Sequence, residues 1–148
     1  MDKQQSEPSV KQEQTKYILE MTEAQARNLV RALDLYSRIG MGQLEAVDQE
    51  VRMWSDESLS SHEEREESIK SLKTALFGFA RGHRAIMSER VHDQYRLAWD
   101  TMKVVRYAVA WHTRPMGGAT VDFATPMKYG SEPLPKCTVK KGSDEQNL

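Results

Sequence analysis

The sequence is short of cysteine, of excess charge and of long apolar runs, and each shortage excludes a class of protein. Its single cysteine, Cys137, cannot form an internal disulfide or a cysteine-based metal site, so nothing indicates an oxidising compartment. Lys and Arg total 21 against 22 Asp and Glu, whereas a protein dedicated to nucleic acid usually carries a large positive excess. No apolar run approaches the roughly 18 residues that cross a bilayer, and the first ten residues lack the apolar centre of a signal peptide. We therefore expect a cytoplasmic protein with neither membrane nor specific nucleic acid as partner.

The two ends of the chain differ in composition from the rest. Residues 1–15 and 140–148 are polar and contain too few apolar side chains to offset the entropy lost on ordering. We expect both to be disordered tails. Residues 16–139 show no repeat and no linker rich in proline or glycine, so they are predicted to form a single globular domain.

Apolar side chains spaced by three and four residues predict four helices. Two begin with capping-box spacing, at Thr22–Gln25 and at Ser61–Glu64. We expect the first to end at Gly40, the second to open near Gly42 and Gln43, the third to end at Gly82, and the fourth to run from a Ser88 cap to about His112. Each helix has an apolar stripe that is expected to be buried: Ala26, Leu29, Val30, Leu33, Tyr36 and Ile39; Leu44, Val47, Val51 and Trp54; Ile69, Leu72, Leu76 and Phe79; Val91, Tyr95, Ala98, Met102, Val105 and Val109.

Three short segments have the composition of β-strands: Tyr17–Met21, Thr120–Phe123 and Lys136–Val139. Pro126, Pro133 and Pro135 separate the last two segments and exclude a helix between them. The sequence therefore predicts a mainly α protein of about four helices, with a small sheet that joins the N-terminal strand to the C-terminal strands, an α+β fold.

Motifs of catalysis and of metal binding are missing. His62, His83, His92 and His112 show no HExxH or other paired-ligand spacing, and neither a phosphate-binding P-loop nor a GxSxG nucleophile elbow occurs. We accordingly expect a protein that is not an enzyme and that has no metal, no cofactor and no catalytic residue.

The segment from Arg38 to Gln43, RIGMGQ, is the first candidate binding site. Gly40 and Gly42 allow a sharp turn with exposed backbone N–H groups, and a helix N-terminus with a free positive dipole end attracts anions. Arg38 would add a positive charge. The alternative is a plain turn between antiparallel helices, in which the glycines serve geometry and Arg38 caps carbonyl groups.

A second candidate lies after the longest predicted helix. The run WHTRP from Trp111 to Pro115 brings an aromatic ring, the His112 imidazole and the Arg114 guanidinium within five residues, followed by Gly117 and Gly118. Nucleotides are held by such groups, through stacking on a ring and bidentate contacts from arginine to phosphate. Arg106 lies on the same helix. The alternative is a helix C-terminus stabilised by basic side chains, with the tryptophan in the core.

Charge is unevenly distributed along the chain. Between Glu45 and Glu67 nine acids face Arg52 and Arg65, a net charge of −7, whereas Lys73 to Arg114 carries eight bases against three acids, a net of +5. The acidic part is either a solvated surface or a mimic of nucleic acid that blocks another protein. The basic part suits an anionic ligand or the acidic part of a neighbouring subunit.

Two segments together resemble a protein family. The run ALDLYSRIGMGQ at residues 32–43 and the C-terminal pattern of His112, Pro115, Gly117, Gly118, VDF at 121–123 and SEPLP at 131–135 resemble small proteins of tailed bacteriophages. That family is similar to the phage proteins that sequester the cyclic nucleotides of bacterial anti-phage signalling. The resemblance implies an oligomer in the host cytoplasm that binds the signal without hydrolysing it.

Taken together, these patterns favour a phage-encoded, non-enzymatic protein that captures an anionic cyclic nucleotide. The residues expected to bind it are Tyr36, Arg38, Gly40, Gly42, Gln43, Arg106, Trp111, His112, Arg114, Gly117 and Gly118. The alternative function is inhibition of a host protein through the acidic helices. Trp99 and Tyr107 lie off the apolar stripe of the longest helix, which predicts a homo-oligomer that uses them as a contact surface.

Overall fold

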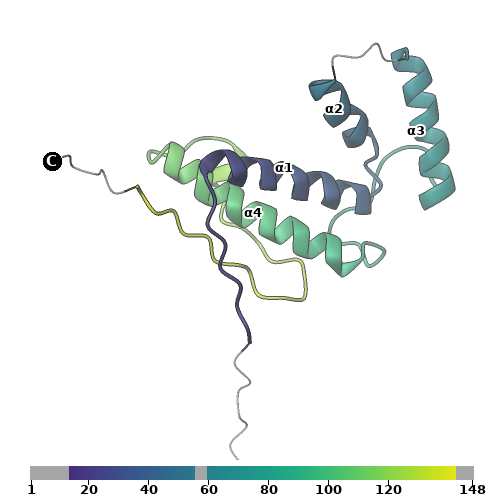
Figure 1. The fold of residues 1–148 in the computed structure, drawn as a ribbon. Helices are drawn as coiled ribbons and strands as arrows, with labels where there is room; N and C mark the ends of the chain where they lie inside the picture. The colour runs from purple at the N-terminus through teal and green to yellow at the C-terminus, as the bar shows by residue number, and fades with distance from the viewer. Residues whose placement is uncertain (1–13, 56–59, 143–148) are drawn as a thin grey trace, which may run out of the picture.

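The computed structural model describes residues 14–55 and 60–142, and within them every regular element is helical (Figure 1). Four α-helices, α1 (Glu23–Gly40), α2 (Glu45–Trp54), α3 (His62–Phe77) and α4 (Asp93–Thr113), precede the short 3₁₀-helix η1 (Val121–Phe123). The tails expected at 1–15 and 140–148 lie mostly outside the described residues. The predicted boundaries of the domain stay a prediction.

Both predicted capping boxes are confirmed. Thr22 Oγ1 accepts from the Gln25 backbone at 3.2 Å while Gln25 Oε1 accepts from the Thr22 backbone at 2.9 Å. Ser61 and Glu64 make the equivalent pair at 3.2 and 3.0 Å. These reciprocal bonds satisfy N–H groups that the first turn of a helix leaves free, which explains why local sequence placed the starts of α1 and α3 correctly.

Three other predicted helix boundaries are wrong. Helix α2 begins at Glu45 rather than near Gly42, because residues 41–43 still donate to α1. Helix α3 ends at Phe77, five residues before the predicted end at Gly82. It ends there because Gly78 adopts a left-handed φ of 78° and donates to the Thr74 carbonyl. Helix α4 begins at Asp93, where the His92 side chain accepts from Gln94, and not at Ser88.

Helices α1 and α4 pack antiparallel and form the body of the molecule (Figure 1). The C-terminus of α1 meets the N-terminus of α4, where the Tyr36 and Tyr95 rings lie 5.0 Å apart. At the other end Arg27 Nη2 donates to Thr113 Oγ1 at 3.2 Å. The buried apolar side chains lie on α4 and in the turns beside it: Met41, Leu44, Ile86, Val91, Ala98, Met102 and Val105.

The predicted β-sheet is wrong, because the described residues contain no strand and the fold is all-α. The Tyr17–Met21 segment is extended and exposed, residues 121–123 form η1, and the Lys136–Val139 segment is extended without strand pairing. The two extended segments are linked by side chains only, through Lys140 to Glu20 at 3.0 Å. A sheet needs backbone pairing between residues far apart in sequence, and local composition does not specify that pairing.

Side chains of α4, not a sheet, hold the C-terminal segment. Asp100 is 2% exposed, and its carboxylate accepts from the Tyr129 and Gly130 backbone N–H groups at 3.0 and 2.8 Å. Asp93 accepts from the Ser131 hydroxyl at 2.5 Å and from the Ser131 backbone at 2.9 Å, and the hydroxyl bond is the main cause that lowers the pKa of Asp93. The segment thus runs along α4 on fixed carboxylate contacts.

The apolar stripes predicted to be buried on α2 and α3 are largely exposed. Val51 and Trp54 on α2 are 53% and 66% exposed, and Leu72 and Leu76 on α3 are 50% and 63% exposed. Helix α2 has no buried residue, and the one buried residue of α3 is Lys73. Among the described helices α3 contacts only α2, so no other described helix covers its apolar side.

Among the described residues, none of the helices combines the length and the apolar character needed to cross a membrane.

Candidate functional site

In the glycine turn after α1, the backbone N–H groups are hydrogen-bonded to carbonyl groups of α1. The backbone N–H groups of Met41, Gly42 and Gln43 donate to α1 carbonyls at 3.1, 3.0 and 2.9 Å. A Cβ atom on Gly40 would lie 2.1 Å from the Tyr95 ring, and one on Gly42 would lie 2.7 Å from the Phe79 ring. The glycines therefore make room for aromatic rings, and the N–H groups predicted to face an anion already have carbonyl partners.

The side chains of this first candidate also have partners within the chain. Arg38 Nε lies 2.6 Å from Asp34 Oδ2, and Arg38 Nη1 donates to Gln43 Oε1 at 2.8 Å. Tyr36 is 43% exposed, but its ring packs against the Tyr95 ring. A phosphate at Arg38 would have to compete with the Asp34 carboxylate for the guanidinium.

The second candidate, after α4, is a small aromatic cluster. The Trp111 ring packs edge-on against Phe123 at 5.4 Å, and its Nε1 donates to the Phe123 carbonyl at 3.4 Å. A Cβ on Gly117 would lie 3.2 Å from the Trp111 ring, and one on Gly118 would lie 2.5 Å from the Phe123 ring. Gly117 and Gly118 therefore leave space for these two rings, as Gly40 and Gly42 do at the first turn.

The basic residues of the second candidate fall into two groups. Arg106 Nε lies 2.9 Å from Asp122 Oδ1 without the alignment of a hydrogen bond, so η1 neutralises it. Nearby, burial and then the Arg106 charge lower the pKa of Lys103. His112 and Arg114 are exposed, and their side chains have no partner among the described residues. Only this second group is free for a ligand.

The two predicted loops do not meet in one chain. Because α1 and α4 are antiparallel, the turn after α1 lies beside Tyr95 at the start of α4, whereas Trp111 lies near its end. Sixteen residues of helix separate the two positions by about 24 Å. A single site built from Arg38 and Arg114 is therefore too wide for one phosphate group to bridge.

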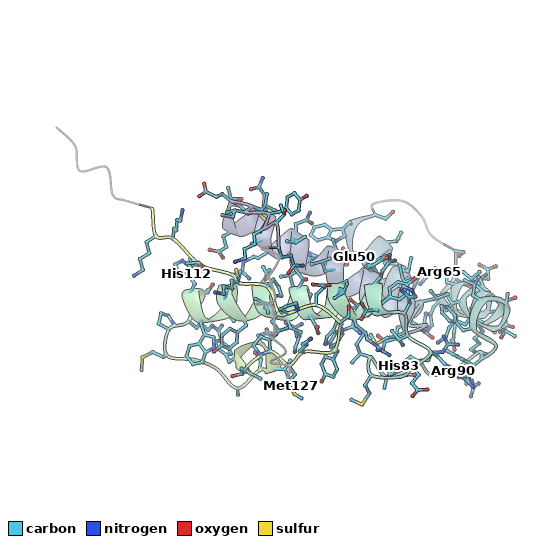
Figure 2. All side chains as sticks on the ribbon, turned by 90° about the horizontal axis from the view of Figure 1, so that it is seen from below. Glu50, Arg65, His83, Arg90, His112 and Met127 are labelled. Atoms are coloured by element: carbon cyan, nitrogen blue, oxygen red, sulfur yellow. The ribbon has the colours of Figure 1, made fainter. Side chains whose placement is uncertain are left out.

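A different group of basic side chains surrounds a hollow in the connection between α3 and α4. The hollow is open, has a volume of about 470 Å³ and lies against Phe79, Arg81, Gly82, His83, Arg84, Ser88 and Arg90. No carboxylate is among these lining residues. Figure 2 shows His83 and Arg90 close together at one end of the molecule and His112 at the other. This basic hollow was not among the sites expected from the sequence.

Contacts from several sides hold the basic hollow in shape. The Arg84 backbone donates to the Met41 carbonyl at 2.8 Å, and the Arg84 guanidinium lies 5.5 Å from the Phe77 ring and 5.7 Å from the Phe79 ring. Lys73 Nζ, inside α3, donates to the Gly82 carbonyl at 2.7 Å. Arg96 on α4 donates to the Ser88 carbonyl at 2.6 Å. The backbone of the hollow is thus fixed before any ligand arrives.

The charge of the basic hollow is not cancelled by the acids around it. Arg81 and Arg90 are exposed and form no ion pair with the described residues. Two acids of α2 and α3 are engaged by lysines: Glu45 lies 2.6 Å from Lys73, and Glu66 lies 2.8 Å from Lys70, whose hydrogen bond lowers the pKa of Glu66. A third acid, Glu89, is exposed and lies in sequence between the lining residues Ser88 and Arg90. An anion entering the hollow therefore meets arginine and histidine donors without displacing a carboxylate.

One sequence signal did indicate this region. The net charge of +5 between Lys73 and Arg114 pointed to an anionic ligand, but it did not say which bases converge. The glycines beside Arg38 and Arg114 predicted the other two candidate sites, whereas Gly82, with a φ of 75°, was expected only to end a helix. A comparison of this chain with protein-family models, curated proteins and solved structures found no match, so the candidate site stands on its residues alone.

Proposed function

We propose that this protein is a non-enzymatic binding protein that captures an anionic, phosphate-bearing ligand in the basic hollow between α3 and α4. The observation that supports the proposal is the convergence of Arg81, His83, Arg84 and Arg90 on one open pocket without a lining carboxylate. Charge-assisted bonds from guanidinium to phosphate are among the stronger polar contacts in proteins. The Phe79 ring offers an apolar wall beside them.

The size of the hollow and the resemblance to phage proteins suggest the ligand class. A volume of about 470 Å³ lies within the range of small-molecule sites. Residues 32–43 and the C-terminal pattern resemble small proteins of tailed bacteriophages, a family similar to the phage proteins that sequester cyclic nucleotides, and this favours a cyclic nucleotide of host defence, bound in the host cytoplasm. Capture requires affinity and no turnover, so a site of donors without a nucleophile suits the task.

The competing function, inhibition of a host protein through an acidic surface, has less support. Glu45 pairs with Lys73, Asp48 with Arg52 and Arg65, and Glu50 with Arg31. These three acids connect α1, α2 and α3 and are less available to a host protein, whereas the acids Glu63, Glu64, Glu66 and Glu67 of α3 are exposed. Asp56 and Glu57 lie outside the described residues.

Calorimetry against cyclic dinucleotides and trinucleotides tests the proposal. We expect binding by the wild type, and we expect the double variant Arg81→Ala/Arg90→Ala to weaken it at least tenfold, since each charged contact contributes about 1.5–3 kcal/mol. Both side chains are exposed and unpaired, so the thermal midpoint of unfolding should hardly change. Intact ligand recovered after denaturing the complex would exclude hydrolysis.

Arg114→Ala is the matched control, because Arg114 is also exposed and unpaired but lies at the opposite end of α4. The proposal predicts unchanged affinity for this variant. Loss of binding in Arg114→Ala with full binding by the double variant would move the site to the Trp111–Gly118 segment. No binding by the wild type to any nucleotide of the panel would overturn the proposed function.

A further inference from the structure

His83 differs from the other charged residues that line the basic hollow, because its charge depends on pH near neutrality. The other charged side chains in the lining are three arginines, Arg81, Arg84 and Arg90. Guanidinium groups stay positive at every ordinary pH, whereas an imidazole gains its charge as the pH falls from about 8 to about 5. His83 is exposed and forms no hydrogen bond or ion pair within the described part of the chain. Both a proton and a ligand can therefore reach it.

The acids around His83 balance little of the positive charge there. Burial raises the pKa of Glu45 on α2, the hydrogen bond and charge of Lys73 lower it, and the charge of His83 contributes least. Glu45 is engaged by Lys73 of α3 at 2.6 Å. Glu89 is exposed in the connection between α3 and α4, and Arg96 of α4 adds a further cation where it donates to the backbone of the hollow. A proton on His83 thus joins an excess of positive charge.

An anion in the hollow and a proton on His83 favour one another. A protonated imidazole donates a charge-assisted hydrogen bond to phosphate, which is roughly twice as strong as the bond from a neutral N–H group. The anion therefore stabilises the protonated form, and the proton in turn strengthens the binding of the anion. Such a coupling between two binding events is equal in both directions.

We propose that His83 makes capture in the basic hollow pH-dependent, so that the anion is held more tightly as the pH falls from about 8 to about 5.5. The three arginines supply the affinity that remains when His83 is neutral. A phosphodiester stays ionised over this whole range, so the change arises in the protein and not in the ligand. The inference rests on the proposed function, because it concerns the same hollow and the same class of ligand.

Calorimetry at the two ends of this pH range tests the inference, with the cyclic dinucleotide of the panel that binds most tightly. The wild-type affinity is expected to rise about five- to tenfold toward acid, the lower part of the range for coupled sites, because the hollow is open to solvent. His83→Gln keeps an N–H donor but cannot be protonated, and its affinity should change by less than about twofold. Both pH values lie above the range, near pH 4, in which glutamate and aspartate titrate.

Two other histidines provide matched controls. His112 is exposed and lies at the other end of the molecule from His83 (Figure 2). His92 lies closer, but its side chain accepts from the Gln94 backbone and caps α4, a role that asparagine also fills. The variants His112→Gln and His92→Asn should both keep the pH dependence of the wild type.

The proton taken up on binding gives a second measurement, which a merely structural role of His83 would not affect. Calorimetry in two buffers of different ionisation enthalpy should show uptake of a fraction of one proton by the wild type near about pH 6.5, and none by His83→Gln. A wild-type affinity that does not change with pH, or a pH dependence that persists in His83→Gln, would overturn the inference and leave the proposed capture intact. An absence of binding at both pH values would overturn the two together.

Discussion

At the scale of the residue, several glycines of this protein make room for aromatic rings, and Gly42 also has a left-handed φ of 79°. Gly40, Gly42 and Gly118 each lie where a Cβ atom would meet an aromatic ring within 3 Å. From the sequence alone, these positions are expected to open the backbone toward a phosphate. The same residue type serves both purposes, and only the neighbouring rings distinguish them.

Replacing Gly40 by alanine should therefore destabilise the fold. The new methyl group would lie 2.1 Å from the Tyr95 ring, between α1 and α4, and overpacking of this kind costs about 1–3 kcal/mol. Urea unfolding measures the loss. Gly142→Ala is the control, because a Cβ there meets nothing within 4 Å, and its midpoint should stay unchanged. Equal stability of Gly40→Ala and the wild type would show that Tyr95 moves away freely.

At the scale of the element, ion pairs take the place of apolar packing between α2 and α3. Arg65 Nε lies 2.8 Å from Asp48, and Lys73 Nζ lies 2.6 Å from Glu45. Burial by itself raises the pKa of Glu45, but the hydrogen bond from Lys73, a backbone hydrogen bond and the charges of Lys73 and His83 together outweigh burial, and the pKa of Glu45 is lowered overall. The pKa of Asp48 is lowered in the same way against burial, by Arg52 and Arg65.

Acid should therefore loosen α3 from α2. Because both carboxyl groups have a lower pKa in the folded state than in the unfolded state, their contribution to stability is complete above the unfolded value, near pH 4, and disappears as the pH falls through the folded value. Urea midpoints measured between pH 7 and pH 2.5 should fall at the acid end. Glu45→Gln should show a smaller fall, and a fall as steep as in the wild type would assign the effect to other carboxyl groups.

Trp99 and Tyr107, which were predicted to form a contact surface between subunits, pack within the chain. Trp99 packs against the cluster of Met41, Ile86 and Val91, and Tyr107 meets the Trp111 ring at 6.2 Å. Both are partly buried within the chain. The predicted homo-oligomer stays a prediction, but the uncovered surface lies on α2 and α3 instead.

At the scale of the whole molecule, the C-terminal segment runs back along α4 and is held there by the buried carboxylate of Asp100. Asp100 accepts two backbone N–H groups from Tyr129 and Gly130, and a Cβ on Gly130 would lie 2.7 Å from Leu97. The C-terminal segment thus depends on α4 for its position.

Asp100→Asn tests this attachment. The amide keeps the shape but loses the charge, and its NH₂ group would face a backbone donor, so we expect a loss of about 1.5–3 kcal/mol in the free energy of unfolding. Limited proteolysis should cut residues 124–142 faster than in the wild type. Glu132→Gln, on the exposed part of the segment, should leave both measurements unchanged. An unchanged rate of cleavage in Asp100→Asn would show that other contacts hold the segment.

The sequence predicted what depends on neighbours along the chain and missed what depends on distant ones. Both capping boxes and the buried stripe of α4, with Ala98, Met102 and Val105, follow from local spacing and are confirmed. The sheet required pairing across more than a hundred residues, and the separation of Arg38 from Arg114 required the direction of α4 relative to α1. The exposure of Leu72 depends on what covers α3, which apolar spacing alone does not reveal.

The attachment of α3 through α2 and a loop has a consequence for local unfolding of the molecule. Proteins open in units whose free energies range from nearly zero to that of global unfolding, and units with few buried apolar contacts open first. Helix α3 belongs to the low end of that range and the α1–α4 pair to the high end. The basic hollow lies on the border between them, with Phe79 following α3 and Arg90 leading into α4. An occupant of that hollow would bind the labile unit to the stable one and slow the exchange of α3 amide hydrogens with solvent.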